Sequence, residues 1–406
     1  MSTAENKKHL DIVLVNLDRI NKVGIFTLAA YSRQRGLSVK IIDGGEREVL
    51  EQFQELNQRC QILAAGFTAT TDIINRVKKL AAEFKKNSPE TFLILGGYHG
   101  TILPEETLLN SDFDLVVVRE GEITLAEALL KLKAGIFPTQ ELGCYEKVAG
   151  RPVFNGQRPI LENLDDLPFP AYDLVNIKKY FHGLRRSNDA QRVMLLLISR
   201  GCPFDCVFCG SKQMWQRRFR LHSVDYVVKL IKWLMAKYRI DGISFLDDEL
   251  LTNQAYINEL CDRFIAECIA QKIKWSCHSR VTSVNLDILK KLKAAGCVLI
   301  RFGIESGSEK VLAYLKNKTV TPAQAYQALA WCRQAQMPAF GSFIIGSPEE
   351  TVEDVAQTIE FIEKSGLSFA EVFALVPYPG TDIYNFARER GLIKSEAVWD
   401  DFMIEG

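Results

Sequence analysis

Residues 193–210 read Val-Met-Leu-Leu-Leu-Ile-Ser-Arg-Gly-Cys-Pro-Phe-Asp-Cys-Val-Phe-Cys-Gly. The apolar run Val193–Ile198 predicts a buried strand, and the glycine-containing loop that follows it carries three cysteines. Their spacing is Cys-x3-Cys-x2-Cys, at Cys202, Cys206 and Cys209. Enzymes on parallel barrels place their chemistry on the loops that follow the strands. The stretch therefore predicts a barrel strand with a metal-binding loop at its carboxyl end.

The number of thiols in this loop indicates the kind of metal site. A structural zinc site normally takes four protein ligands, whereas this loop supplies three with no obvious fourth beside them. Three thiolates suit a cubane iron–sulfur cluster, in which one iron then stays open to a ligand. A zinc site or a degenerate loop is the alternative. The seven other cysteines lie on apolar stretches, where burial in the core is the usual outcome.

Further apolar runs follow the first one, separated by helix-length amphipathic stretches. They lie at Gly242–Leu246, Ile273–Cys277, Val298–Phe302, Phe340–Ile345 and Val372–Val376. Strands that alternate with helices indicate βα units and a parallel sheet. Six such units predict a partial (βα)6 barrel of the TIM type over residues 191–385.

The amino-terminal part of the chain shows the same alternation between residues 10 and 135. It predicts an α/β fold, a five-stranded doubly wound, Rossmann-like domain over residues 1–140. The pair Gly96-Gly97 follows one of its predicted strands, where such sheets bind ligands. Residues 141–190 break the alternation and predict a linker, and residues 386–406 predict a short carboxyl-terminal extension.

Composition excludes several classes of function. The 406 residues include 50 basic and 50 acidic side chains, so the chain lacks the basic excess that neutralises nucleic-acid phosphates. The first eight residues are polar, and no apolar run approaches the ~20 residues of a membrane span. We therefore expect a cytoplasmic protein with no nucleic-acid partner and no membrane span.

The cysteine loop and the predicted strand ends resemble the radical S-adenosylmethionine (SAM) superfamily over nearly the whole barrel. In that family three cysteines hold a [4Fe–4S] cluster whose open iron binds SAM, and electron transfer to SAM releases a 5′-deoxyadenosyl radical. The resemblance implies that Asp247 or Asp248 meets the SAM ammonium. It implies that Arg280 faces the SAM carboxylate and that Glu305 accepts from the ribose hydroxyls. The other residues that it places at SAM are Phe208, Ser306 and Gly346.

With its doubly wound domain, the chain is similar to the cobalamin-binding members of this superfamily. The similarity spans residues 10–385 and includes the linker stretch Leu164–Ala171. It implies that loops at the strand ends of the amino-terminal domain line the corrin ring and its dimethylbenzimidazole tail. The residues implicated in this way are Gly66, Thr68, Gly96, Gly97, Tyr98, His99, Glu120, Gly121 and Glu122.

The loop expected below the cobalt differs from the corresponding loop in one branch of these proteins. Members that ligate cobalt through histidine carry Asp-x-His-x-x-Gly after the first strand, whereas residues 18–24 here contain no histidine. We therefore expect cobalamin without a histidine lower ligand. His99 is the alternative ligand, because it alone among the five histidines falls in an expected cobalamin loop.

The resemblance implies a methyltransferase in which methylcobalamin delivers a methyl group to a carbon of a small-molecule substrate. An external one-electron donor such as a flavodoxin or ferredoxin would reduce the cluster. A non-methylating cyclisation or rearrangement is one alternative, and a corrinoid carrier or sensor with a vestigial barrel is another. Methylthiotransferases that act on RNA are excluded, because their second cluster needs three amino-terminal cysteines and residues 1–150 contain only Cys60 and Cys144. The sequence identifies neither the substrate nor a catalytic residue.

Overall fold

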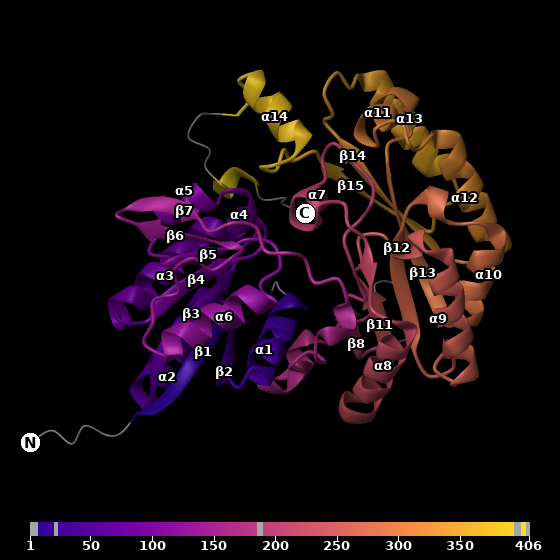
Figure 1. The fold of residues 1–406 in the computed structure, drawn as a ribbon. Coiled ribbons are helices and arrows are strands. Elements are labelled where there is room, and N and C mark those ends of the chain that lie inside the picture. Colours follow the sequence, from indigo (N-terminus) through magenta and orange to yellow (C-terminus); the bar gives the residue numbers. More distant parts are fainter. Residues whose placement is uncertain (1–6, 20–22, 185–189, 394–398, 403–406) are drawn as a thin grey trace, which may run out of the picture. The chain divides into compact units, whose positions relative to one another are not determined.

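The structure is a computed structural model that describes residues 7–19, 23–184, 190–393 and 399–402. These residues form two compact units, shown from indigo to yellow along the chain in Figure 1. Unit 1 contains the described residues up to 162, residues 166–180 and residues 399–402, whereas unit 2 contains residues 163–165 and 181–393. None of the helices in these described ranges is long and apolar enough to cross a bilayer.

Unit 1 is built on a seven-stranded sheet with the order β2-β1-β3-β4-β5-β6-β7. Its parallel strands are β1 (Lys8–Leu17), β2 (Val39–Gly44), β3 (Cys60–Thr68), β4 (Phe92–Gly96) and β5 (Leu115–Val117). The order 2-1-3-4-5 is one of the doubly wound arrangements. It confirms the fold expected of the amino-terminal domain.

Helices cover both faces of this parallel sheet. They are α1 (Gly24–Gln34), α2 (Glu46–Arg59), α3 (Ile74–Asn87), α4 (Tyr98–Ile102), α5 (Pro104–Leu109) and α6 (Glu122–Lys133). Helix α1 packs against α6, and α2 packs against α3. The central strand β1 is buried at every residue from Leu10 onward, because a parallel strand covered on both faces needs apolar side chains on both.

An antiparallel hairpin extends the sheet within the segment 141–190 that the sequence suggested as a linker. Its strands are β6 (Cys144–Val148), which pairs with β5, and β7 (Arg151–Phe154) at the sheet edge. Most side chains of β7 are exposed, so this strand lacks the apolar run by which the buried strands were recognised. The sheet therefore continues past the expected boundary at residue 140.

Unit 2 carries a six-stranded parallel sheet with the order β15-β14-β13-β12-β11-β8. The strands are β8 (Val193–Leu196), β11 (Gly242–Phe245), β12 (Lys274–Ser279), β13 (Cys297–Glu305), β14 (Ala339–Ile345) and β15 (Phe369–Ala374). A short antiparallel pair, β9 (Ser199–Arg200) and β10 (Arg220–Leu221), brackets the cysteine loop. This arrangement confirms the partial (βα)6 barrel.

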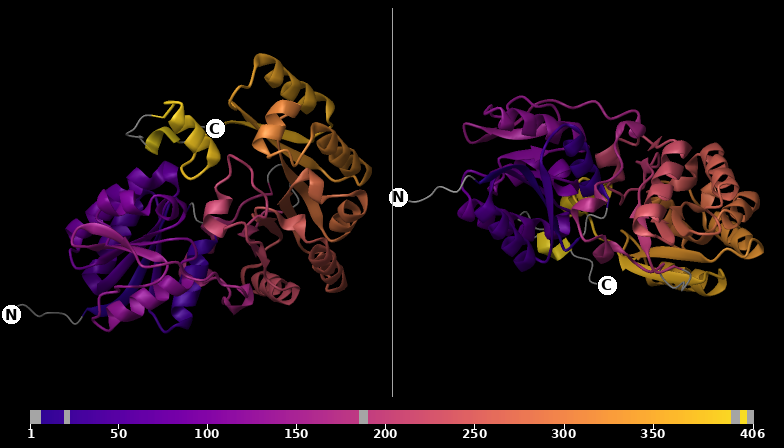
Figure 2. Two further views of the ribbon diagram at one scale, coloured as in Figure 1. Left: turned by 45° about the horizontal axis from the view of Figure 1, so that its top comes forward. Right: turned by 90° about the horizontal axis from the view of Figure 1, so that it is seen from below.

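The helices described in unit 2 are α7 (Ser211–Trp215), α8 (Val224–Tyr238), α9 (Gln254–Ala266), α10 (Leu286–Ala294), α11 (Glu309–Leu315), α12 (Pro322–Gln334), α13 (Val352–Lys364) and α14 (Asp382–Glu389). Helices α8 to α13 lie along the outer side of the curved sheet, whereas α7 and α14 lie apart from this layer (Figures 1 and 2). Several begin at a side-chain cap. Thr321 and Gln324, for example, form a reciprocal capping box at the start of α12, with Pro322 as its first residue.

Candidate functional site

The cysteine loop leaves β9 at a glycine that no other residue could replace without strain. Gly201 has φ +90°, and a Cβ atom there would lie 2.0 Å from the carbonyl oxygen of Arg218. Further along the loop, the Val207 amide donates to the Leu315 carbonyl at 3.1 Å, and the Cys209 amide donates to the Cys206 carbonyl at 3.1 Å. The backbone thus holds the loop against the end of α11.

All three loop cysteines are partly exposed and free of disulfides, as a ligand-binding thiol must be. Burial raises the pKa of Cys202 to about 12 and that of Cys209 to about 11. Within the described ranges, no three His, Cys, Asp or Glu side chains converge on a single ion position. A cubane cluster does not require such convergence, since each thiolate bonds a different iron.

Arg280, which follows β12, lies against this loop. Its Nη1 is 3.5 Å from Cys206 Sγ, its Nη2 donates to Thr319 Oγ1 at 2.7 Å, and its guanidinium stacks over the Phe204 ring at 3.8 Å. The Nε atom is buried and has no hydrogen-bond partner among the described residues. The residues present therefore fit both expected groups: a cation lies beside the thiols, and an unused donor fits the carboxylate of SAM.

Glu305, at the end of β13, pairs with a residue that the sequence analysis missed. Lys316 Nζ donates to Glu305 Oε1 at 2.7 Å, and both side chains are less than a tenth exposed. Lys316 also lies over the ring of Phe208 at 5.5 Å. A lysine in the stretch Lys-Asn-Lys resembles an exposed helix end, so no sequence signal marked it as buried.

Three other predicted SAM residues differ in their surroundings. Asp248 is exposed, and its Oδ2 accepts from Ser211 Oγ at 2.5 Å, just past the cysteine loop. Asp247 is buried, where its Oδ1 accepts from the Ile198 amide at 2.9 Å. Ser306 is buried as well, 3.0 Å from Thr358 Oγ1. Asp248 is thus on the accessible side, whereas Asp247 and Ser306 bond within the barrel scaffold.

Gly346, the remaining SAM candidate, follows β14 with φ +90°. Its amide donates to Glu350 Oε2 at 2.5 Å, so its backbone is held in this left-handed turn. A Cβ atom there would approach only the Leu375 amide nitrogen, at 4.0 Å. The space above this strand end is therefore open.

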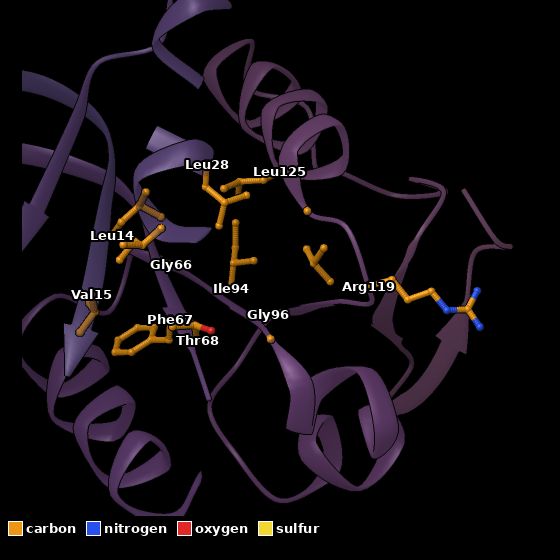
Figure 3. Close-up of a pocket in the computed structure, with 14 residues that line it drawn as sticks. Leu14, Val15, Leu28, Gly66, Phe67, Thr68, Ile94, Gly96, Arg119 and Leu125 are labelled. Carbon is orange, nitrogen blue, oxygen red and sulfur yellow. The ribbon is translucent and has the colours of Figure 1, made fainter. Parts of the chain in front are cut away.

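A pocket opens at the strand ends of unit 1, where the strand order reverses (Figure 3). It contains about 510 Å³ of space not filled by protein atoms, its open mouth included. Leu14, Leu28, Ile94 and Leu125 extend into it in Figure 3, whereas the side chain of Arg119 points away. The residues of the sequence prediction that line it are Gly66, Thr68, Gly96, Gly97 and Gly121.

The pocket fits a flat, apolar group such as the dimethylbenzimidazole tail. A Cβ atom at Gly96 would find no heavy atom closer than 3.9 Å, so this glycine borders open space. Gly97 differs, because its φ is +90° and a Cβ atom would lie 2.5 Å from Thr68 Oγ1. Gly97 is thus needed for the turn, and Gly96 leaves space in the pocket for a ligand.

The other predicted cobalamin residues lie outside this pocket. Glu120 and Glu122 line a neighbouring cleft, where Glu120 Oε2 accepts from the Leu161 amide at 3.1 Å. Tyr98 and His99 begin α4. His99 is fully buried between Thr71 Oγ1, at 3.3 Å, and Glu106 Oε2, at 3.5 Å, and burial lowers its pKa.

The loop between β1 and α1, which was compared with the histidine signature, is described only in part. Residues 20–22 lie outside the described residues. Asp18, on its near side, forms an ion pair with Arg76 at 2.7 Å. The sequence of residues 18–24 contains no histidine.

Comparison with known proteins bears on both units. The family described as the radical SAM superfamily matches residues 196–362, and the B12 binding domain matches residues 11–129. An uncharacterized methyltransferase of Pyrococcus horikoshii is 34% identical over 373 residues, which cover 91% of this chain and 79% of that protein. Cytidylyl-2-hydroxyethylphosphonate methyltransferase of Streptomyces wedmorensis is 23% identical, with 93% of this chain and 83% of that protein covered.

A solved structure shares the fold of the chain. The radical SAM methyltransferase TsrM from Kitasatospora setae, with cobalamin and a [4Fe–4S] cluster bound, has a TM-score of 0.77 and 15% identity. The similarity covers 95% of this chain and 75% of that one.

Proposed function

Because the chain belongs to the cobalamin-dependent radical SAM methyltransferases, we propose that it transfers a methyl group to a carbon of a small-molecule substrate. The observation that carries the proposal is the unused, buried Nε of Arg280 beside Cys206. A barrel that served only as scaffold for a corrinoid carrier would not need a buried cation with an open donor beside three thiols.

In this proposal each residue of the barrel site has a separate task. Cys202, Cys206 and Cys209 would hold the [4Fe–4S] cluster. Arg280 would bind the SAM carboxylate through Nε, since a planar guanidinium matches a carboxylate. Asp248 would meet the SAM ammonium, and Glu305 would accept from a ribose hydroxyl. When bound, the cluster supplies the electron that cleaves SAM, and cobalamin supplies the methyl group.

The pocket of unit 1 would hold the tail of cobalamin. Gly96 leaves the room that a planar ring needs, and burial of the ring against the mostly apolar walls would be favourable. Residues 18–24 bring no imidazole to the lower face of the cobalt. His99, the alternative ligand, is buried against Thr71 and Glu106, and we propose that it does not bind the cobalt either.

We place the reaction in the cytoplasm, with a flavodoxin or ferredoxin as donor and without nucleic acid. All ten cysteines are free, which suits a reducing compartment. A cluster of this kind also needs thiolates that are not consumed by disulfides. The balanced charge of the chain gives no reason to expect a polyanionic substrate.

The experiment uses the full chain, reconstituted without oxygen with iron, sulfide and hydroxocobalamin. SAM that carries a trideuterated methyl group is added with a chemical reductant and candidate small molecules. We expect about four irons and one cobalt per chain after desalting, and both S-adenosylhomocysteine and 5′-deoxyadenosine among the products. The matched control is the Cys202→Ala, Cys206→Ala, Cys209→Ala variant, which should form neither product.

The two products distinguish the rival functions. Formation of 5′-deoxyadenosine without S-adenosylhomocysteine, with any substrate, would indicate a cyclisation or rearrangement in place of methyl transfer. Bound cobalt without SAM cleavage would indicate a corrinoid carrier. Deuterium found only in a protein or a lipid would contradict a small-molecule substrate.

A further inference from the structure

Lys316 lies at the barrel site, yet neither the cysteine motif nor the predicted SAM contacts include it. It caps the carboxyl end of α11 and carries its ammonium group into the site. The exposed fraction of its side chain is 6%, and that of Glu305 is 8%. We propose that Lys316 is a positioning residue that sets the charge at the cysteine loop and holds Glu305 toward the ligand, an inference that rests on the proposed cluster site.

Glu305 is the carboxylate that Lys316 contacts directly. Its Nζ donates to Glu305 Oε1 at 2.7 Å and lies 5.5 Å from the centre of the Phe208 ring, in the cysteine loop itself. Burial alone would lower the pKa of Lys316, but attraction to Glu305 and to Cys206 raises it. The ammonium is therefore charged and is attracted to the cysteine loop.

Glu305 has an unusual backbone that this pair helps to maintain. Its φ is +75°, a left-handed conformation that is unfavourable for a residue with a side chain. Gly303, two residues earlier, provides the room, because a Cβ atom there would lie 2.5 Å from Glu305 Oε1. One carboxylate oxygen, Oε1, is held by Lys316.

Electrostatics gives this pair an effect on the cluster as well as on SAM. Three thiolates give the site negative charge, and reduction adds one more electron. A buried cation is screened less than an exposed one, so it stabilises the reduced form, and a buried anion opposes it. Hydrogen bonds and charges around a cluster are among the known determinants of its reduction potential.

The test measures the reduction potential of the cluster in the full, reconstituted chain without SAM, by a redox titration followed with electron paramagnetic resonance. Lys316→Met leaves Glu305 as an uncompensated anion, so we expect a lower potential. Glu305→Gln leaves the cation, so we expect a higher one. Each shift should change the ratio of reduced to oxidised cluster by about tenfold at a given potential, which is roughly 59 mV for one electron.

Two further variants separate charge from structure. Lys316→Arg keeps the positive charge, so its cluster should have a reduction potential closer to that of the wild type than Lys316→Met has. The double variant Lys316→Met, Glu305→Gln should have a potential between those of the two single variants. Lys318→Met, two residues away and exposed, is the matched control and should leave the potential unchanged.

Shifts of the same sign in both single variants, or none in either, would overturn the proposal. Should Lys316→Met fail to hold iron, the sign of the shift in Glu305→Gln still decides. Failure of the proposed function is distinguishable from these outcomes, because a wild-type chain that assembles no cluster would refute the cluster site before any variant is compared.

Discussion

Arg280 uses two of its nitrogens on protein partners and leaves the third without one. Nη2 bonds Thr319 Oγ1, and Nη1 contacts Cys206 Sγ, while Nε is buried without a partner among the described residues. A buried donor that forms no hydrogen bond carries a desolvation cost of roughly 1–3 kcal/mol. A carboxylate bound at that donor would offset this cost, which is why the residue fits a ligand and not the scaffold.

Replacement of Arg280 by methionine tests this fit. The variant keeps much of the packing over Phe204 but loses the donor, so SAM binding should weaken by about tenfold or more, as for a charged hydrogen bond. Equilibrium dialysis of SAM against the reconstituted, unreduced chain measures the affinity. Arg47→Met, an exposed arginine, is the control. Equal affinity in the wild type and Arg280→Met would refute the role.

Gly201 provides a second prediction at the level of one residue. In Gly201→Ala the new Cβ atom would clash with the Arg218 carbonyl, and the backbone would be strained at φ +90°. We expect a loss of roughly 1–3 kcal/mol in local stability and less than half of the wild-type iron content after reconstitution. Gly183→Ala, where a Cβ atom meets nothing within 4 Å, should bind iron normally. A fully loaded Gly201→Ala chain would contradict the argument.

The start of α8 is held by a helix cap and by a buried histidine that contacts Asp165. Ser223 caps the helix by accepting from the Tyr226 amide. His222, just before the cap, lies 3.1 Å from Asp165 Oδ1 and stacks on the Tyr226 ring at 4.0 Å. Burial lowers the pKa of His222 to about 4, although Asp165 opposes the shift. The helix start is thus held by a neutral imidazole.

A pH dependence follows from His222. Between pH 6.5 and pH 4 the unfolded chain binds a proton at this histidine that the folded chain does not, so stability falls as the pH falls through that window. This proton uptake lowers the free energy of unfolding by up to about 3 kcal/mol. His222→Gln should lose less thermal stability between pH 7 and pH 5 than the wild type, measured by differential scanning fluorimetry. His9→Gln, at a half-exposed histidine, is the control and should lose as much thermal stability between pH 7 and pH 5 as the wild type. An equal loss in His222→Gln would contradict the role of His222.

At the scale of the whole molecule, the two expected cofactor sites belong to different units. The pocket with Gly96 lies in unit 1, and the cysteine loop with Arg280 lies in unit 2. Each unit has its own parallel sheet. Each can therefore assemble its site from its own residues.

Independent loading of the two metals is the expected consequence. The variant with all three loop cysteines changed to alanine should lose iron and retain cobalt. Gly96→Val should retain iron and lose cobalt, because Gly96 lines the pocket and an added side chain would take up space that the ligand needs. Iron and cobalt are quantified after anaerobic reconstitution and desalting. Loss of cobalt in both variants would show that the sites do not load separately.

The two α/β architectures and the metal-binding loop could be predicted from local sequence patterns. Parallel strands buried on both faces are continuous apolar runs, and a cluster loop requires a fixed cysteine spacing; both are local features that a linear pattern preserves. The strands found as β8, β11, β12, β13 and β14 could be placed for this reason. The positions of Gly96-Gly97 and Arg280 at strand ends also followed from it.

Local patterns did not indicate which polar side chains are buried in the scaffold and which lie at the site; this became clear from the folded structure. Asp247 and Asp248 are neighbours in sequence, yet the first is buried against Ile198 and Ser199 and the second is exposed beside the cysteine loop. Lys316 is buried through its contact with Glu305, eleven residues earlier. The physical reason is that burial and charge pairing depend on packing between elements distant in the chain, whereas strand and loop patterns depend on adjacent residues.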